Sequence, residues 1–315
     1  MEFKSFIVKN SEINARLDIY ISKLLPKISR SQISNLIKQN LIKVNNNNVK
    51  PGYSIKTDDV IDIKIPEQKT AKYDPEQINI NIIYNDEYIA VINKDPSIVV
   101  HPAPGHYSGT LVNAILYHFP EIKSVGQRCG LVHRLDQYTS GCIVIAKNDE
   151  AHLKLSNSFK NRSVSKTYLA LVYGEMEQSS GIIKYNIGRH PIDRKKMAVL
   201  ENKGRICETR WFVYKRFYGF TLLKVKLMTG RTHQIRVHLS AIKHPVVGDP
   251  IYCSNSYLNK LNNDYFNFLK TINRQMLHAW QLGFKHPANN NDMLFEAPIP
   301  QDMKNILDKL SYHVV

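Results

Sequence analysis

A polar stretch with two prolines, residues 66–77, divides the chain into two parts of very different size. Its sequence is Pro-Glu-Gln-Lys-Thr-Ala-Lys-Tyr-Asp-Pro-Glu-Gln, and this composition is typical of a linker. A chain of 315 residues has room for one large and one small domain. We therefore predict a small domain over residues 1–65, a linker over 66–77 and a large domain over 78–315.

The small domain is predicted to contain two helices followed by short strands. Apolar residues recur at helical spacing in two segments, and Pro26 ends the first of them. Ser29 or Ser31 is the expected cap of the second helix. Residues 41–50, with four central asparagines, predict a hairpin, and residues 60–65 alternate as a strand.

Positive charge is the clearest bulk property of the chain. Lysine and arginine exceed aspartate and glutamate by 43 to 27, which gives a net charge of +16. A charge of this size favours a polyanionic partner such as nucleic acid or an anionic membrane. Four basic residues gather around the second helix, where they suit either phosphate contact or a solvated charged face: Lys27, Arg30, Lys38 and Lys43.

Several function classes find no support in the sequence. It contains no dinucleotide-binding glycine motif, P-loop or serine hydrolase elbow. Its four cysteines include no Cys-x-x-Cys pair, and the spacing of its histidines fits no common metal site. No apolar run reaches the ~18 residues of a membrane span, and the N-terminus does not resemble a signal peptide. We expect a soluble cytoplasmic protein.

The segment from His133 to Cys142 is the strongest candidate for chemistry. It reads His-Arg-Leu-Asp-Gln-Tyr-Thr-Ser-Gly-Cys, with apolar pairs and triplets on either side. Those flanking runs predict two buried strands, so Asp136 would lie on a connector held by rigid structure. The alternative is an ordinary turn whose aspartate caps its own backbone.

Two further segments supply possible partners for this carboxylate. Residues 166–174 alternate as a strand and place Tyr168, Ala170 and Val172 on one face, where the tyrosine either faces a site or packs in the core. A strand through residues 222–227 ends at Thr229-Gly230 and is followed by Arg231 and a helix that Thr232 could cap. Because a buried arginine needs a carboxylate, we predict that Arg231 pairs with Asp136 and lowers its pKa.

At this point the sequence resembles a known family. His133-Arg-Leu-Asp-x-x-Thr-Ser-Gly141 is similar to the signature of RluA-type pseudouridine synthases, and further segments resemble other motifs of that family in the correct order. They are residues 91–94, 99–102, 109–114, 166–174, 229–238, 248–250, 277–279 and 297–303. Residues 15–65 resemble the S-four type RNA-binding domain, and residues 187–191 and 195–199 are most similar to the RluD branch. One departure is Asn93-Lys94-Asp95-Pro96, where the family usually has Lys-Pro.

The resemblance implies an α+β fold, with a catalytic domain built on a mixed, mostly antiparallel sheet with flanking helices, an active cleft crossing the sheet face, and a small N-terminal α+β RNA-binding domain. It implies isomerisation of uridine to pseudouridine after base flipping. Asp136 would be the catalytic carboxylate, Tyr168 would stack on the uracil, and Arg231 would keep Asp136 charged. Arg134 would brace the flipped nucleotide, and His133 would pack locally beside it. The reaction needs no cofactor and no metal.

For the RluD branch the implied substrate is ribosomal RNA of the large subunit, free or in pre-ribosomal particles, and we expect a monomer. The sibling specificities, RluC-like on other rRNA uridines or RluA-like on tRNA, are the main alternative. Two other classes also remain: a non-catalytic RNA-binding assembly factor, and a base-excising glycosylase. An Asp136→Asn variant separates the first of these from a synthase, and free uracil in the products would indicate the second.

Overall fold

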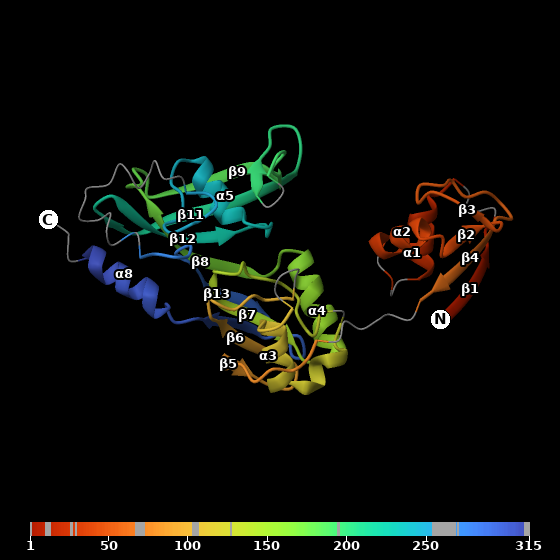
Figure 1. Ribbon diagram of the computed structural model, residues 1–315, viewed down its shortest axis with the longest axis horizontal. Coiled ribbons are helices and arrows are strands. Elements are labelled where there is room, and N and C mark those ends of the chain that lie inside the picture. The colour runs from red at the N-terminus through yellow and green to blue at the C-terminus, as the bar shows by residue number, and fades with distance from the viewer. Residues whose placement is uncertain are drawn as a thin grey trace. The chain divides into compact units, whose positions relative to one another are not determined.

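The computed structural model describes residues 2–9, 14–25, 28, 30–66, 73–102, 107–126, 128–193, 196–253, 269 and 271–311. The chain forms two units, residues 1–72 and residues 73–315 (Figure 1). The predicted linker contains this boundary. Asp74 already belongs to the larger unit, where its carbonyl accepts a hydrogen bond from Asn113 Nδ2 (2.8 Å). No helix in the described ranges combines the length and apolar character that a membrane crossing requires.

The small unit is a four-stranded antiparallel sheet with two helices. Its elements are β1 (Glu2–Ile7), α1 (Leu17–Leu24), α2 (Arg30–Lys38), β2 (Ile42–Val44), β3 (Asn47–Asn48) and β4 (Val60–Ile65), and the strand order is β1-β4-β2-β3. Both helices, the hairpin and the last strand are confirmed. Asn45 and Asn46 form the hairpin turn with positive φ angles (49° and 62°), which asparagine tolerates better than most residues. The sequence analysis missed β1.

The large unit is built on one ten-stranded sheet. Nine strands follow the order β10-β9-β11-β12-β8-β13-β7-β6-β5, and the tenth, β14, pairs with β13. Only β13 and β7 pair in parallel among the described strands, so the predicted mixed, mostly antiparallel sheet is confirmed. The strands are β5 (Asn81–Asn85), β6 (Ile89–Lys94), β7 (Ser140–Ala146), β8 (Ser165–Tyr173), β9 (Ser180–Arg189), β10 (Met197–Val199), β11 (Arg205–Phe217), β12 (Phe220–Leu227), β13 (Leu277–Lys285) and β14 (Asp292–Glu296).

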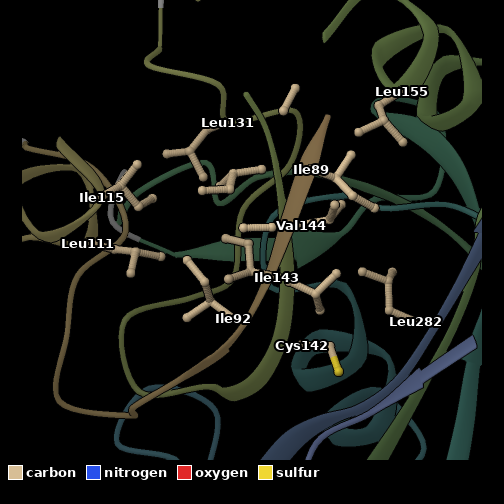
Figure 2. Close-up of a cluster of buried hydrophobic side chains, with 14 of the residues drawn as sticks. Ile89, Ile92, Leu111, Ile115, Leu131, Cys142, Ile143, Val144, Leu155 and Leu282 are labelled. Atoms are coloured by element: carbon tan, nitrogen blue, oxygen red, sulfur yellow. The ribbon is translucent and has the colours of Figure 1, made fainter. Parts of the chain in front are cut away.

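Helices cover both faces of this sheet. They are α3 (Leu111–His118), α4 (Asp149–Lys160), α5 (Gln234–Ala241) and α8 (Gln301–Ser311), with a 3-10 turn, η2, at Pro120–Ser124. Figure 2 shows the core at the β6–β7 end, where Ile89, Ile143 and Val144 pack with Leu111 of α3 and Leu155 of α4. Both strands are buried on both faces, which explains their continuous apolar sequences.

Strand β8 divides the remaining core between two helices. Ala170 and Val172 pack in the same apolar cluster as Ile235 and Leu239, so this face of the sheet lies under α5. The alternate residues, among them Leu169 and Leu171, pack instead with Met303, Ile306 and Leu310 of α8. The predicted alternation of β8 and the predicted helix after Arg231 are therefore confirmed. We call these two sides the α5 face and the α8 face.

Two local predictions were wrong. The segment before Asp136 is not a strand, because Leu131 makes only a single bridge to Ile145 and residues 132–139 are irregular. Helix α5 begins at Gln234, and its N-cap is His233 in the left-handed conformation (φ 57°, ψ 20°) rather than Thr232. The turn after β12 thus continues one residue further than the cap pattern indicated. The later start of α5 changes which arginine reaches the carboxylate.

Candidate active site

A pocket of about 470 Å³ opens where the connector of residues 131–139 meets the α5 face of the sheet. The connector contributes Arg134, Leu135 and Asp136 to its lining, and β8 contributes Lys166 and Tyr168. The turn after β12 and the first residues of α5 form the opposite wall: Thr229, Gly230, Arg231, Thr232, His233, Gln234, Ile235 and Arg236. The three segments singled out in the sequence therefore converge on one cavity.

Asp136 is held at the edge of this pocket by a buried arginine. Arg236 Nη1 donates to Asp136 Oδ2 at 3.3 Å, while its Nε and Nη2 bind the two oxygens of Asp249 at 2.6 and 2.8 Å. The side chains of Arg236 and Asp249 are 4% and 0% exposed, whereas that of Asp136 is 19% exposed. One guanidinium thus serves two carboxylates, and only Asp136 lies open to a ligand.

The charge of Arg236 is fixed by this arrangement. Burial opposes the guanidinium charge, but the hydrogen bonds and charge of Asp249, together with Asp136, outweigh it and raise the pKa of Arg236. Asp249 is positioned in turn by the backbone N–H groups of Ile251 and Tyr252, which donate to its Oδ1 at 2.9 and 3.0 Å. Arg236 therefore stays a cation beside Asp136 at any physiological pH.

The predicted partner of Asp136, Arg231, is not the one that the structure places there. The ion pair to Asp136 comes from Arg236, because α5 starts only at Gln234 and presents its third residue to the carboxylate. Arg231 lines the same pocket, and its buried Nε has no hydrogen-bond partner among the described residues. A buried, unpaired donor at a cavity wall is available to a bound ligand.

The sequence analysis also missed Arg236, Asp249 and the groups that hold the connector. Gly248-Asp249-Pro250 and the second arginine of residues 229–238 stood within the family-like motifs, without an assigned role. Pairing every arginine in those motifs with every nearby acidic residue would have found this interaction. Spacing alone could not, because the two residues are thirteen positions apart on different segments.

Two buried cations hold the backbone just after Asp136. Lys94 at the end of β6 is 1% exposed, and its Nζ donates to the carbonyls of Asp95, Ile98 and Gln137 at 2.7, 2.8 and 2.9 Å. Burial opposes its charge and lowers the pKa of Lys94 to about 7, although the negative charges of Asp95 and Asp136 act in the other direction. The departure from the family pattern, Asp95 before Pro96, directly follows this lysine.

The second cation comes from the other end of the sequence. Arg274 Nη1 donates to the carbonyl of Tyr138 at 3.1 Å, and Asp302 of α8 binds the same guanidinium with two hydrogen bonds of 2.6 and 2.9 Å. The carbonyls of Gln137 and Tyr138 are thus bound by side chains from two distant segments. The catalytic candidate lies on irregular backbone that is nevertheless fixed by buried hydrogen bonds.

Tyr168 lines the pocket from β8, partly buried against two apolar clusters. Burial raises the pKa of its hydroxyl well above the ordinary value, and the negative charge of Asp136 adds to this shift. The phenol is therefore neutral and can both donate and accept a hydrogen bond. Its ring provides an apolar wall, and its hydroxyl provides a polar group in the same cavity.

Two histidines in the pocket wall have partners within the protein. His133 Nε2 accepts a hydrogen bond from the Val144 N–H (3.0 Å), and its ring stacks on Phe159 with centroids 4.5 Å apart. Burial lowers the pKa of His133 to about 3, so it is neutral and packs locally. His233 lies with Nε2 3.9 Å from Asp136 Oδ2, and its Nδ1 is hydrogen-bonded to the Tyr252 hydroxyl.

The predicted RNA-contacting residues lie in both units. Arg134 is exposed at the pocket. In the small unit, Arg30 is paired with the buried Asp18 at 2.9 Å but remains half-exposed, Lys38 is exposed, and Lys43 is half-buried on β2. Lys27 and Ser29 lie outside the described residues. The pairing of Arg30 means that part of its charge is used within the fold.

Comparison with known proteins agrees with the geometry. Residues 88–241 match the RNA pseudouridylate synthase family, and residues 15–61 match the S4 domain. The chain is 42% identical to an uncharacterized RNA pseudouridine synthase of Aquifex aeolicus, over 99% of this chain and 98% of that protein. It is 40% identical to the ribosomal large subunit pseudouridine synthase D of Pseudomonas aeruginosa, over 94% and 92% of the two chains.

A solved structure extends the likeness to three dimensions. Human RNA pseudouridylate synthase domain containing 1 superimposes with a TM-score of 0.56 at 27% sequence identity, over 74% of this chain and 95% of that one. The family match over residues 88–241 includes Asp136, Tyr168 and Arg236. The chain belongs to the RluA-type family of RNA pseudouridine synthases and carries an N-terminal S4 domain.

Proposed function

We propose that this enzyme converts specific uridines of large-subunit ribosomal RNA to pseudouridine, with Asp136 as the catalytic carboxylate. The RNA target is supported by relatives named ribosomal large subunit pseudouridine synthase D, which are 36–40% identical over at least 94% of this chain. The S4 domain and the net charge of +16 support a large polyanionic substrate. The reaction takes place in the cytoplasm, on free RNA or on pre-ribosomal particles, and the enzyme acts as a monomer.

The target uridine must leave its base stack to enter the pocket. The pocket of about 470 Å³ can take one nucleotide, and the carboxylate of Asp136 lies at its edge. Extruding a base costs a few kcal/mol of unstacking. Arg134, exposed at the pocket beside Asp136, is suited to fill the vacated stack or bind the flanking phosphate. Tyr168 then stacks on the flipped uracil from β8.

The chemical step exchanges one bond for another within the nucleotide. The N1–C1′ bond breaks and the detached uracil turns. A C5–C1′ bond then forms, N1 gains a proton and C5 loses one. Asp136 either attacks C1′ or removes a proton from the sugar, and both routes require it to be ionised. The neutral phenol of Tyr168 can carry the proton that C5 gives up.

Arginines on two sides complete the proposed site. Arg236, held by Asp249, places a guanidinium charge beside Asp136 and fixes the orientation of its carboxylate. The buried Nε of Arg231 has no hydrogen-bond partner among the described residues, which supports a role as donor to a uracil carbonyl or to a phosphate of the bound RNA. We therefore move the role first predicted for Arg231 to Arg236 and assign Arg231 to substrate binding.

The observation that carries this proposal is the partial exposure of Asp136 at the pocket, whereas Arg236, which binds it, and Asp249, which binds Arg236, are buried. An ionisable group that lies in a cleft beside a specific charge partner is a candidate for a functional role. A binding protein without activity has no need of such a group. This makes an assembly factor the weaker explanation.

The test is to incubate the enzyme with unmodified large-subunit ribosomal RNA and map pseudouridine by carbodiimide treatment and primer extension. New stops at a few uridines, absent with Asp136→Asn, would support the proposal. Stops only on tRNA or other RNA would move the target and keep the reaction. Free uracil or abasic sites would indicate a glycosylase, and no stops on either naked or assembled RNA would favour the binding protein.

A further inference from the structure

The α8 face of the sheet carries a second cationic surface, on the opposite side from the pocket. Val225 of β12 packs in the α5-face cluster, so its neighbours Lys224 and Lys226 point to the other face. Lys224 lies opposite Phe212 of β11, and Lys226 lies opposite Arg210 of the same strand. Helix α8 covers this face where Phe220 and Leu222 are buried, and the lysines lie further along the strand.

Aromatic rings accompany these lysines. Lys224 Nζ lies 4.4 Å from the ring centroid of Tyr214 and 4.9 Å from that of Trp280, so it sits between the two. Lys226 Nζ lies 6.0 Å from the centroid of Phe212. Tyr214 and Phe212 are 51% and 41% exposed, so both rings are accessible to a ligand. We call Phe212, Tyr214, Lys224, Lys226 and Trp280 the aromatic–lysine face.

The charge of this face is not neutralised locally. Lys184 of β9 and Arg210 share the carboxylate of Glu208, at 3.2 and 2.7 Å. Neither Lys224 nor Lys226 has a carboxylate partner within the described part of the chain. Their cationic heads are therefore held by aromatic rings alone and remain available to an anionic ligand.

We propose that the aromatic–lysine face binds a second segment of the substrate RNA, one with unpaired bases. Exposed rings interleaved with cations are the features that bind single-stranded nucleic acid, because bases stack on the rings while phosphates meet the charges. The site lies on the other side of the sheet from the pocket and cannot touch the flipped uridine. It would add affinity for a long RNA without taking part in the reaction. The proposal rests on the enzyme acting on RNA, whichever uridine is the target.

The experiment compares two RNAs on the full-length enzyme. One is a short hairpin that contains an unmodified target uridine, and the other is a long large-subunit rRNA fragment around the same hairpin. Tyr214→Ala removes a ring and leaves the charge unchanged, Lys224→Glu reverses a charge, and Lys285→Glu is a matched charge reversal at the exposed end of β13. Dissociation constants are measured over a range of salt concentrations, together with kcat on the hairpin.

We expect Tyr214→Ala and Lys224→Glu to weaken binding of the long RNA about 5- to 50-fold, because stacking on one ring is worth about that much. Lys224→Glu should also reduce, by about one, the slope of the logarithm of the binding constant for the long RNA against the logarithm of the salt concentration. Binding and kcat on the hairpin should not change, and Lys285→Glu should leave both RNAs unaffected. If the enzyme does not modify the hairpin, the proposed target is wrong. The comparison of long-RNA and hairpin binding between wild type and variants still tests the aromatic–lysine face.

Three results would overturn the proposal: unchanged binding of the long RNA in both variants, equal weakening of both RNAs, or weakening by Lys285→Glu as large as that by Lys224→Glu. A fourth is binding of wild-type enzyme to anionic phosphatidylserine vesicles that both variants lose while long-RNA binding is retained. That outcome would assign the face to a membrane surface.

Discussion

At the scale of single residues, the site depends on one guanidinium shared by two carboxylates. Asp249 is fully buried and takes the bidentate interaction, so Arg236 has a fixed direction from which it reaches Asp136. Replacing Asp136 should lower kcat, whereas replacing Asp249 should lower both kcat and the free energy of unfolding. The two carboxylates therefore differ in role because they differ in exposure.

This difference predicts the effect of Asp249→Asn. The buried cation would lose its main counter-charge, and breaking a buried pair of this kind costs about 3 kcal/mol of unfolding free energy. We expect kcat to fall as well, because Arg236 becomes free to turn away from Asp136. Chemical denaturation and steady-state kinetics measure the two effects. Glu208→Gln, which removes the carboxylate of an exposed ion pair, is the control and should change neither. A variant as stable as wild type would contradict the account.

The sequence predicted some of the residues of this site but not their partners. Asp136 and Tyr168 stand in short segments whose strand and turn patterns are readable locally. The partner of Asp136 was misassigned to Arg231 because local sequence does not show which of the two arginines in residues 229–238 reaches the carboxylate. Lys94 and Arg274 act through carbonyls far away in the sequence, and no local pattern reports such contacts.

At the scale of elements, the connector of residues 131–139 is irregular yet held in place. Its carbonyls at Gln137 and Tyr138 are bound by Lys94 from β6 and by Arg274, which α8 anchors through Asp302. Irregular backbone that is fixed by buried donors can carry a reactive group with little freedom. The position of Asp136 should therefore depend on residues that never touch the substrate.

Lys94→Met tests this dependence. The variant keeps the length of the side chain but loses three hydrogen bonds, so the connector should shift, and we expect kcat to fall about 10- to 100-fold with KM little changed. Lys147→Met is the matched control, because Lys147 also donates to a backbone carbonyl, that of Asp86 (2.7 Å), but lies outside the pocket lining. If both variants kept the wild-type kcat, the connector would not need this lysine.

Gly141 is the second element-scale prediction. It is the second residue of β7 and has φ at +112°, and a Cβ there would lie 2.2 Å from the carbonyl oxygen of Ala279 on the parallel strand β13. Gly141→Ala should therefore cost at least about 2 kcal/mol of unfolding free energy. Gly230→Ala, where φ is not positive and the nearest atom is the flexible Lys166 Nζ at 3.6 Å, should be nearly neutral. Equal unfolding midpoints for the two variants would contradict this view of the β7–β13 contact.

The order of elements could be predicted only in part. Strands with clear alternation, such as β8, and helices with apolar stripes, such as α5, follow from local sequence. The insertion of β13 between β8 and β7 does not, because it joins residues more than a hundred positions apart. The parallel pairing of β13 with β7 brings this C-terminal segment beside the connector of residues 131–139.

At the scale of the whole molecule, buried histidines couple the fold to pH. His238 and His278 are fully buried, and burial lowers the pKa of each to about 4, below the ordinary value of 6.5. Between pH 6.5 and 4, these two histidines are therefore protonated in the unfolded chain and neutral in the folded chain. Each histidine contributes about 3 kcal/mol of stability that is present above pH 6.5 and is lost as the pH falls to 4.

The prediction is a steep loss of stability across that range, which His238→Phe should reduce. Unfolding by denaturant at pH 7, 6, 5 and 4 gives the slope for each variant. His118→Gln, on an exposed position of α3, is the control and should keep the wild-type slope. A His238→Phe slope equal to that of wild type would show that this histidine is not neutral and buried in solution.

The central claim is that the ionised carboxylate of Asp136 carries out the exchange of bonds at C1′. The most direct measurement is single-turnover release of tritium from RNA labelled at C5 of uridine, because C5 loses its hydrogen only when it bonds to C1′. The account predicts one tritium released per modified uridine for the wild-type enzyme, and none for Asp136→Asn, which should bind the same RNA with unchanged affinity. Release by Asp136→Asn at the wild-type rate would contradict the account.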